Sequence, residues 1–159
     1  AYEDLERKTL QVQSRPKVLI NMPFNEQWHL PGGLSFSAQL IRDAGAFYPW
    51  ESNQSKESTP LDFEVVFKQA FDCDFWINAG VFSSYDQVLV TLPDMALFNA
   101  FKNKQVFNNN ARTNLNGGND YWESGSLHVD EVLADLISIF HPDLLPNHTL
   151  KYYKPLLNE

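Results

Sequence analysis

The sequence lacks several features that would assign it to a common functional class. It has one cysteine, Cys73, which excludes an intramolecular disulfide and a zinc site built from cysteines. It has no apolar run of roughly eighteen residues or more, so no segment is expected to span a bilayer. Basic residues are few, with 12 Lys and Arg against 20 Asp and Glu and a net charge of −8. This balance argues against nucleic acid and anionic membranes as partners.

Catalytic motifs are also missing. The sequence contains no GxGxxG or P-loop, no GxSxG and no HExxH, and its four histidines have no i, i+4 pair. Glu26 and His29 could share a metal, but solvation of both is the preferred interpretation. Glu123 could act as a general base, yet no nucleophile or second carboxylate is placed to assist it. The sequence therefore predicts a binding protein rather than an enzyme, with no cofactor and no resident metal.

Composition indicates one folded domain. The chain has 159 residues, of which 43% are apolar and 14% aromatic, enough for a sizeable core. Cys73 lies in the apolar-flanked run AFDCDFWI and is expected to be a small buried hydrophobe rather than a reactive thiol.

Strands and helices alternate in the sequence pattern. The apolar runs 17–24 and 74–80 predict strands buried on both faces, and 105–108 predicts a third strand. Helices are expected at 1–13, 35–44, 61–71 (with Thr59 as N-cap and Pro60 at the first position), 85–90, 93–104 and 130–140. Residues 25–33 and 53–59 are expected to be loops. The pattern predicts an α/β fold, a three-layer sandwich with a mainly parallel sheet flanked by helices.

Ligands of open parallel sheets bind beyond the carboxyl ends of the strands, which selects the loops 25–34, 80–84 and 109–126. In the first loop, Gly33 would let backbone approach a ligand. In the last, NGGNDYWESG, Trp122 or Tyr121 would stack on a ligand and Asn119 would hydrogen-bond it. The alternative for this last loop is a stable turn whose two aromatics fill the edge of the core.

Four segments carry a resemblance to a known family. They are RPKVLINMPF (15–24), PGGLSFSAQLIRDAGAFYPW (31–50), LDFEVVFKQAFDCDFWIN (61–78) and NGGNDYWESGSLHVDEVLADLISIFHPDLLPNHTLKYYKPL (116–156). In this order they resemble the C-terminal lobe of ABC-transporter substrate-binding proteins of the iron-siderophore, haem and cobalamin type, in the variant common in Bacteroidetes. That family has a chelatase-like, helical-backbone metal-receptor fold of two lobes joined by a long helix.

The resemblance implies a domain plan and a role. Residues 1–14 would be the end of the connecting helix, and 15–159 the C-terminal lobe, so the chain looks like a piece of a longer protein. The parent would be a periplasmic or outside-facing lipoprotein that carries an iron-siderophore, haem or cobalamin to an ABC permease in the inner membrane. Its own N-terminal lobe would be a partner, and the face that meets it would be apolar and exposed, allowing self-association.

The resemblance also implies site residues. The cleft-facing positions would be Phe24, Trp28, Gly33, Val81, Phe82, Asn119, Tyr121 and Trp122. In cobalamin-binding members a surface glutamate at the start of the helix that matches 35–44 docks on permease arginines. Leu34 occupies that position here, and Glu26 is the nearby carboxylate expected to take its place.

Two other functions stay open from the sequence. A chelatase-like enzyme would use His29, His128 and Glu123 to present a metal to a tetrapyrrole, and would need these side chains to converge on one pocket. A protein-interaction module would instead use the cleft face for contacts with another chain.

Overall fold

The centre of the molecule is a four-stranded sheet. The computed structural model describes residues 1–113 and 118–158, apart from the side chain of Glu123. The strands β1 (Val18–Ile20), β4 (Phe75–Ile77), β5 (Val106–Asn108) and β6 (Lys154–Pro155) lie in the order β1-β4-β5-β6. The first three are parallel, with Leu19 opposite Trp76 and Trp76 opposite Val106, and β6 is antiparallel to β5. The predicted mainly parallel sheet is confirmed.

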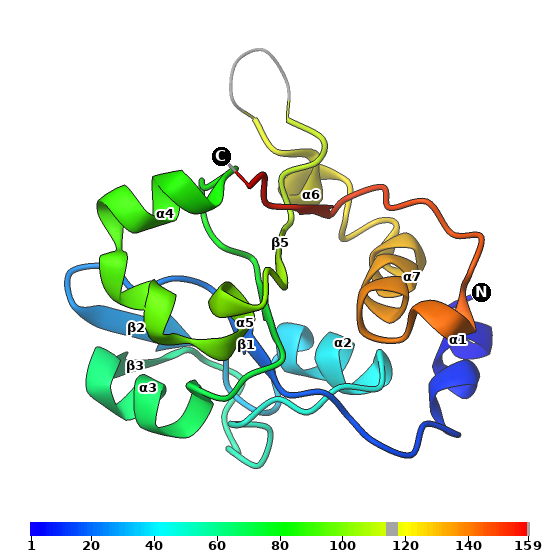
Figure 1. Cartoon of the computed structure of the whole chain (residues 1–159). Coiled ribbons are helices and arrows are strands. Elements are labelled where there is room, and N and C mark those ends of the chain that lie inside the picture. The colour runs from blue at the N-terminus through cyan, green and yellow to red at the C-terminus, as the bar shows by residue number, and fades with distance from the viewer. Residues whose placement is uncertain (114–117, 159) are drawn as a thin grey trace.

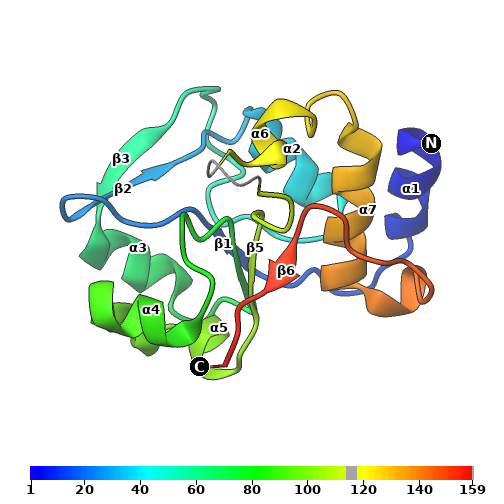
Figure 2. The same cartoon turned by 90° about the horizontal axis from the view of Figure 1, so that it is seen from above.

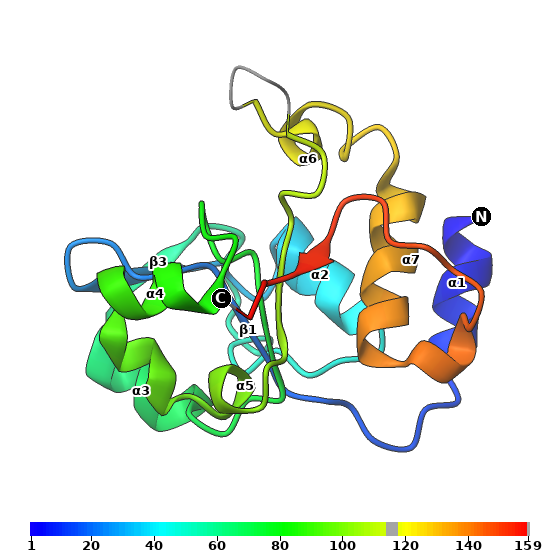
Figure 3. The same ribbon diagram turned by 45° about the horizontal axis from the view of Figure 1, so that its top comes forward.

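Helices cover both faces of this sheet, so the predicted three-layer arrangement is also confirmed. Figures 1 to 3 show one group of helices on each side of the strands. One side holds α1 (Tyr2–Thr9), α2 (Phe36–Asp43) and α7 (Val129–Phe140), with the 3₁₀ helix η2 (Pro142–Leu144) after α7. The other holds α3 (Phe63–Ala70), α4 (Tyr85–Thr91), η1 (Pro93–Leu97) and α5 (Asn99–Lys102), while the single turn α6 (Asp120–Glu123) stands above the sheet.

A second, two-stranded sheet was not predicted. The strands β2 (Gln27–Leu30) and β3 (Thr59–Asp62) pair antiparallel, with Trp28 opposite Leu61. The prediction of loop for 25–33 is wrong, because Trp28 and Leu30 alternate with exposed neighbours and bury their side chains in the core. The predicted cap at Thr59 is wrong as well. Thr59 and Pro60 belong to β3, and α3 begins only at Phe63 with Asp62 as its N-cap residue.

The ends of α2 follow the expected chemistry. The Ser35 side chain accepts a hydrogen bond of 3.1 Å from the Ala38 backbone N–H, which caps the first turn. After the helix, Gly45 adopts a φ of +79°, a conformation that favours glycine. His141, which follows α7, places its Nε2 2.8 Å from the Gly45 carbonyl oxygen, so a side chain at position 45 would collide with that ring. The two helices are thereby joined at their C-terminal ends.

A buried carboxylate fixes the C-terminal segment to α7. Asp135 is fully buried on α7 and accepts hydrogen bonds from the backbone N–H groups of Lys151, Tyr152 and Tyr153, at 2.7–3.1 Å. Nε2 of His148 lies 2.7 Å from Oδ1 of Asp135, which the Lys151 N–H also contacts. The segment so held continues into β6 at the edge of the sheet.

Cys73 is a core residue, as predicted. It has no exposed surface, and burial raises the pKa of its thiol to about 12. Of the helices that the structure describes, none combines the length and apolar character that crossing a membrane would require.

Candidate functional site: an asparagine-lined cavity

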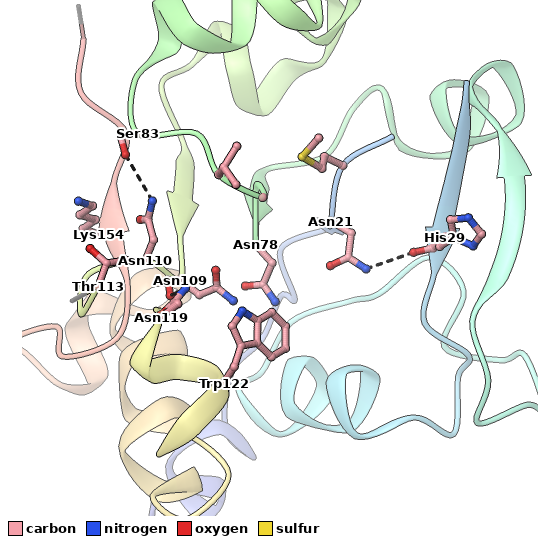
Figure 4. A pocket seen from close by; sticks show the side chains of 13 residues that line it. Asn21, His29, Asn78, Ser83, Asn109, Asn110, Thr113, Asn119, Trp122 and Lys154 are labelled. Carbon is pink, nitrogen blue, oxygen red and sulfur yellow. Dashed lines mark hydrogen bonds between the residues drawn. The ribbon is translucent and has the colours of Figure 1, made fainter. Parts of the chain in front are cut away.

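A cavity of about 740 Å³ opens at the carboxyl edge of the parallel strands (Figure 4). This is the edge at which ligands bind in open parallel sheets. The described residues that line it are Asn21, Met22, His29, Asn78, Gly80, Val81, Ser83, Asn109, Asn110, Thr113, Asn119, Trp122 and Lys154. Five of them are asparagines, and none is Asp, Glu or Arg.

Three of the asparagines occupy equivalent positions, because each directly follows a parallel strand. Asn21 follows β1, Asn78 follows β4 and Asn109 follows β5. Asn21 and Asn78 have φ angles of 69° and 56°, in the left-handed region that asparagine tolerates better than most residues. The backbone thus turns at the ends of β1 and β4 and leaves an amide at the cavity wall on each.

The loop after β4 is held by two further amides. Nδ2 of Asn108 donates to the carbonyl oxygens of Gly80 and Phe82, at 2.9 and 2.7 Å. Nδ2 of Asn110 donates to the same Phe82 oxygen at 3.2 Å and lies 3.4 Å from Oγ of Ser83. These bonds tie the 80–83 loop to the end of β5.

Two buried amide atoms at the cavity have no hydrogen-bond partner among the described residues. They are Nδ2 of Asn109 and Oδ1 of Asn110, on residues that are 3% and 8% exposed. Most buried polar atoms in proteins are paired, so an unpaired donor and an unpaired acceptor on two residues of the cavity wall are candidates for contact with a ligand.

The α6 turn supplies the aromatic wall. The Asn119 side chain caps the turn by accepting from the Tyr121 N–H at 3.0 Å, and its Nδ2 donates to the Asn109 carbonyl oxygen at 2.9 Å. Trp122 is 68% exposed and meets the Tyr121 ring edge-on, with centroids 4.8 Å apart. Figure 4 shows its indole beside the amides of Asn78 and Asn109.

Tyr121 lies behind this wall. Its ring meets those of Tyr152 and Tyr153 edge-on, and burial raises the pKa of its hydroxyl, although hydrogen bonding with Tyr153 and Asn78 offsets part of that effect. The Tyr153 hydroxyl donates to Oδ1 of Asn78 at 2.7 Å, and burial also raises its pKa. The tyrosines thus support the cavity floor.

Of the eight cleft-facing residues predicted from the sequence, three line the cavity, one supports it from behind and four do neither. Val81, Asn119 and Trp122 line the cavity, whereas Tyr121 supports it from behind. Phe24 is 67% exposed, but it is not among the lining residues. Trp28, Gly33 and Phe82 are buried and line no part of it.

Trp28 and Gly33 are packing residues, so their assignment to the cleft is corrected. Trp28 has no exposed surface, donates from its indole N–H to the Ile20 carbonyl oxygen at 2.9 Å and packs against Phe63 and Phe98. A Cβ at Gly33 would stand 2.3 Å from the Asn53 carbonyl oxygen, so the glycine admits the neighbouring loop rather than a ligand. Phe82 is 4% exposed, with its side chain in the core.

Sequence reasoning missed the asparagines that follow the strands. The signal was present, since VLIN, FWIN and QVFNNN each end an apolar run with asparagine. One such ending is an ordinary turn signal, and only the repetition at three neighbouring strands indicates a shared wall.

The residues proposed for a chelatase are not gathered by the described structure. His29 is on β2 and lines the cavity, whereas His128 is exposed at the N-terminus of α7. The side chain of Glu123 lies outside the described part. Among all the residues that the structure describes, no three His, Cys, Asp or Glu side chains form a group that could hold a metal ion.

Glu26 lies in a different hollow of about 670 Å³, between the β2–β3 sheet and the α4–η1 segment. It is exposed there and shares the wall with three other carboxylates, Asp62, Glu64 and Asp94. This surface is therefore acidic.

Known proteins with similar sequences or folds give a context for this cavity. No family model matches the sequence. An uncharacterized lipoprotein of Methanocaldococcus jannaschii is 25% identical over 159 residues, and the match covers 96% of this chain and 36% of the lipoprotein. The chain thus spans about a third of that relative.

Solved structures of similar fold include periplasmic binding proteins. A TroA-like periplasmic binding protein, FepB of Veillonella parvula, has a TM-score of 0.67 at 13% identity, covering 98% of this chain and 53% of its own. Ceue of Helicobacter pylori, solved with Ni(II) bound, has a TM-score of 0.66 at 14% identity, covering 93% and 45%. The chain therefore has the fold of one lobe of the TroA-like periplasmic solute-binding proteins.

Proposed function

We propose that this chain is the C-terminal lobe of the solute-binding component of an ABC importer, and that its cargo is an iron-siderophore or a related metal chelate. The observation that carries the proposal is the cavity at the carboxyl edge of the sheet. Its wall combines amides, an exposed indole and aliphatic side chains, groups that hold a ligand by hydrogen bonds and stacking. The fold of the binding-protein lobes supports the same role.

The cavity has the form of half a cleft. Val81 is 85% exposed and Trp122 68%, which is unusual for large apolar side chains at a binding site unless a second surface covers them. An N-terminal lobe facing this edge would bury both. In this proposal residues 1–14, which include α1, are the end of the helix that connects the two lobes.

The partner for delivery is an ABC permease in the inner membrane. The exposed Glu26 and the carboxylates around it form an acidic surface suited to basic residues of a permease. The protein would act as a periplasmic or outside-facing lipoprotein, in line with the lipoprotein relative. It would be a carrier and not an enzyme, and the metal chelate would be cargo rather than a cofactor.

The test is a titration of the full-length protein, with both lobes, against ferric siderophores, haem and cobalamin, followed by tryptophan fluorescence. Saturable quenching by any of them supports capture, because Trp122 stands at the cavity mouth. Absence of a response to every compound, repeated by isothermal calorimetry to detect silent binding, would reject the proposal. Lysozyme titrated in parallel controls for light absorption by the coloured ligands.

A further inference from the structure

The cavity lining that the structure describes carries little charge, and this limits what this lobe can select. Its titratable lining residues, within the described part, are Lys154 and His29, while the whole chain has a net charge of −8. A polyanionic chelate would need several cations at the wall to offset the cost of losing its water. A bare metal ion would need carboxylates or clustered imidazoles, and the described residues gather no such group here.

The asparagine amides of the cavity wall further limit which ligands can bind. Asn21, Asn78, Asn109, Asn110 and Asn119 present neutral donors and acceptors over much of the wall. Asn119 pairs both ends of its amide within the protein, and Asn21, Asn78 and Asn110 each pair one end. A flat porphyrin face would still leave Nδ2 of Asn109 and Oδ1 of Asn110 without partners, and each unsatisfied buried polar group costs about 1–3 kcal/mol. A ligand with amide or hydroxamate groups on its outer surface would pair with them.

The two unpaired amide atoms require specific hydrogen-bond partners from a ligand. Nδ2 of Asn109 is a donor without an acceptor, and Oδ1 of Asn110 is an acceptor without a donor, on two residues that line the cavity. A ligand that brings both a carbonyl and an N–H or O–H to this wall would satisfy them. The exposed Trp122 indole lies beside Asn109, where it would stack on the same ligand (Figure 4).

We propose that the cavity selects an electrically neutral metal chelate whose surface carries amide or hydroxamate groups, and that Asn109 and Asn110 recognise those groups. The inference rests on the proposed function, since it names the class of cargo for the same site. The shared chemistry has two sources, the hydroxamates of a ferric trishydroxamate and the carboxamide side chains of a corrinoid.

The experiment compares ligands of different charge on the full-length protein by isothermal calorimetry. The probes are ferrichrome and cyanocobalamin as neutral chelates, ferric enterobactin as an anionic triscatecholate, haem, and Ni²⁺ alone. We expect one of the two neutral chelates to bind at least about tenfold more tightly than the anionic chelate, haem or the bare ion. If ferrichrome binds, the cavity recognises hydroxamates, and if cyanocobalamin binds, it recognises the carboxamides of a corrinoid.

Two substitutions test the role of Asn109. Asn109→Asp keeps the shape but replaces the unpaired N–H donor with an oxygen, so we expect affinity for the neutral chelate to fall about tenfold or more. Since Nδ2 makes no bond in the described protein, Asn109→Ala should lower affinity similarly with little change in Tm. Asn147→Asp, an exposed site outside the cavity lining, is the matched control for the added charge.

The outcomes separate the two proposals. Tightest binding of haem, the anionic chelate or the bare ion overturns the inference and leaves capture standing. Unchanged affinity in both Asn109 variants removes Asn109 from recognition and overturns the inference as stated. Binding of no probe overturns the proposed function itself.

Discussion

The hydroxyl of Tyr153 donates a 2.7 Å hydrogen bond to Oδ1 of Asn78, and so joins two segments that are 75 residues apart. Tyr153 belongs to the C-terminal segment that Asp135 anchors, and Asn78 is the cavity residue at the end of β4. The orientation of the Asn78 amide at the cavity wall is therefore set by a residue that itself lies outside the cavity lining.

Replacing this tyrosine should affect both stability and binding. Tyr153→Phe leaves Oδ1 of Asn78 without its buried donor, so the free energy of unfolding should fall by about 1–3 kcal/mol. Affinity for the cargo should also fall, because the Asn78 amide can turn. Tyr48→Phe is the matched control, since it loses a buried 2.6 Å bond to the Pro31 carbonyl oxygen outside the cavity lining. Urea unfolding and calorimetry measure the two effects, and equal affinity in both variants would contradict the expectation.

Trp122 should matter for binding and not for folding. Its indole is 68% exposed, so Trp122→Ala should leave Tm nearly unchanged while affinity in the full-length protein falls about tenfold or more. Leu127→Ala, at a residue 78% exposed outside the cavity lining, is the control for loss of an exposed apolar side chain. Calorimetry decides, and undiminished affinity in Trp122→Ala would remove this residue from the site.

Asp135 should be among the residues most sensitive to substitution. Asp135→Ala leaves three backbone N–H groups and the His148 ring without their acceptor, so the free energy of unfolding should fall by about 3–5 kcal/mol. Asp143→Ala, at an exposed acidic residue near the end of α7, should have little effect. Thermal unfolding followed by circular dichroism measures both, and similar Tm values for the two variants would refute the anchoring role.

The buried thiol of Cys73 predicts a loss of stability at alkaline pH. Its pKa is about 12 in the folded protein and near 9.0 when exposed, so only the unfolded chain loses this proton between those values. Stability from this group is fully present well below pH 9 and should have fallen by about 1 kcal/mol at pH 10. Urea unfolding at pH 8, 9 and 10 measures the change, and Cys73→Ala should reduce the slope. Parallel pH profiles of the two proteins would show that the thiol contributes nothing.

Long apolar patterns were predictable from the sequence. The apolar runs around Leu19 and Trp76 gave the parallel strands, and the apolar stripe at 130–140 matches α7 with one residue added at its start. These signals are local, because one segment holds the whole pattern. The pairing of β2 with β3 was not predictable in the same way, since His29 and Pro60 become partners only through contacts 31 residues apart.

The candidate site was only partly predictable for the same reason. The loops chosen by the rule for parallel sheets contain Val81, Asn119 and Trp122, which line the cavity. Within a loop, however, side-chain direction depends on packing. Trp28 was chosen as an aromatic near a strand end, yet its place in the alternating strand β2 turns it into the core.

The asparagines after β1 and β4 serve the backbone and the cavity at once, and this restricts how the site can evolve. Asn21 and Asn78 hold left-handed turns that glycine, asparagine and aspartate accept most readily. A change of cargo that needed a new side chain at either position would strain the turn, whereas Asn119, with a φ of −107°, is free of that restriction. Descendants of this protein should therefore alter specificity at the α6 turn and keep the two strand-end residues.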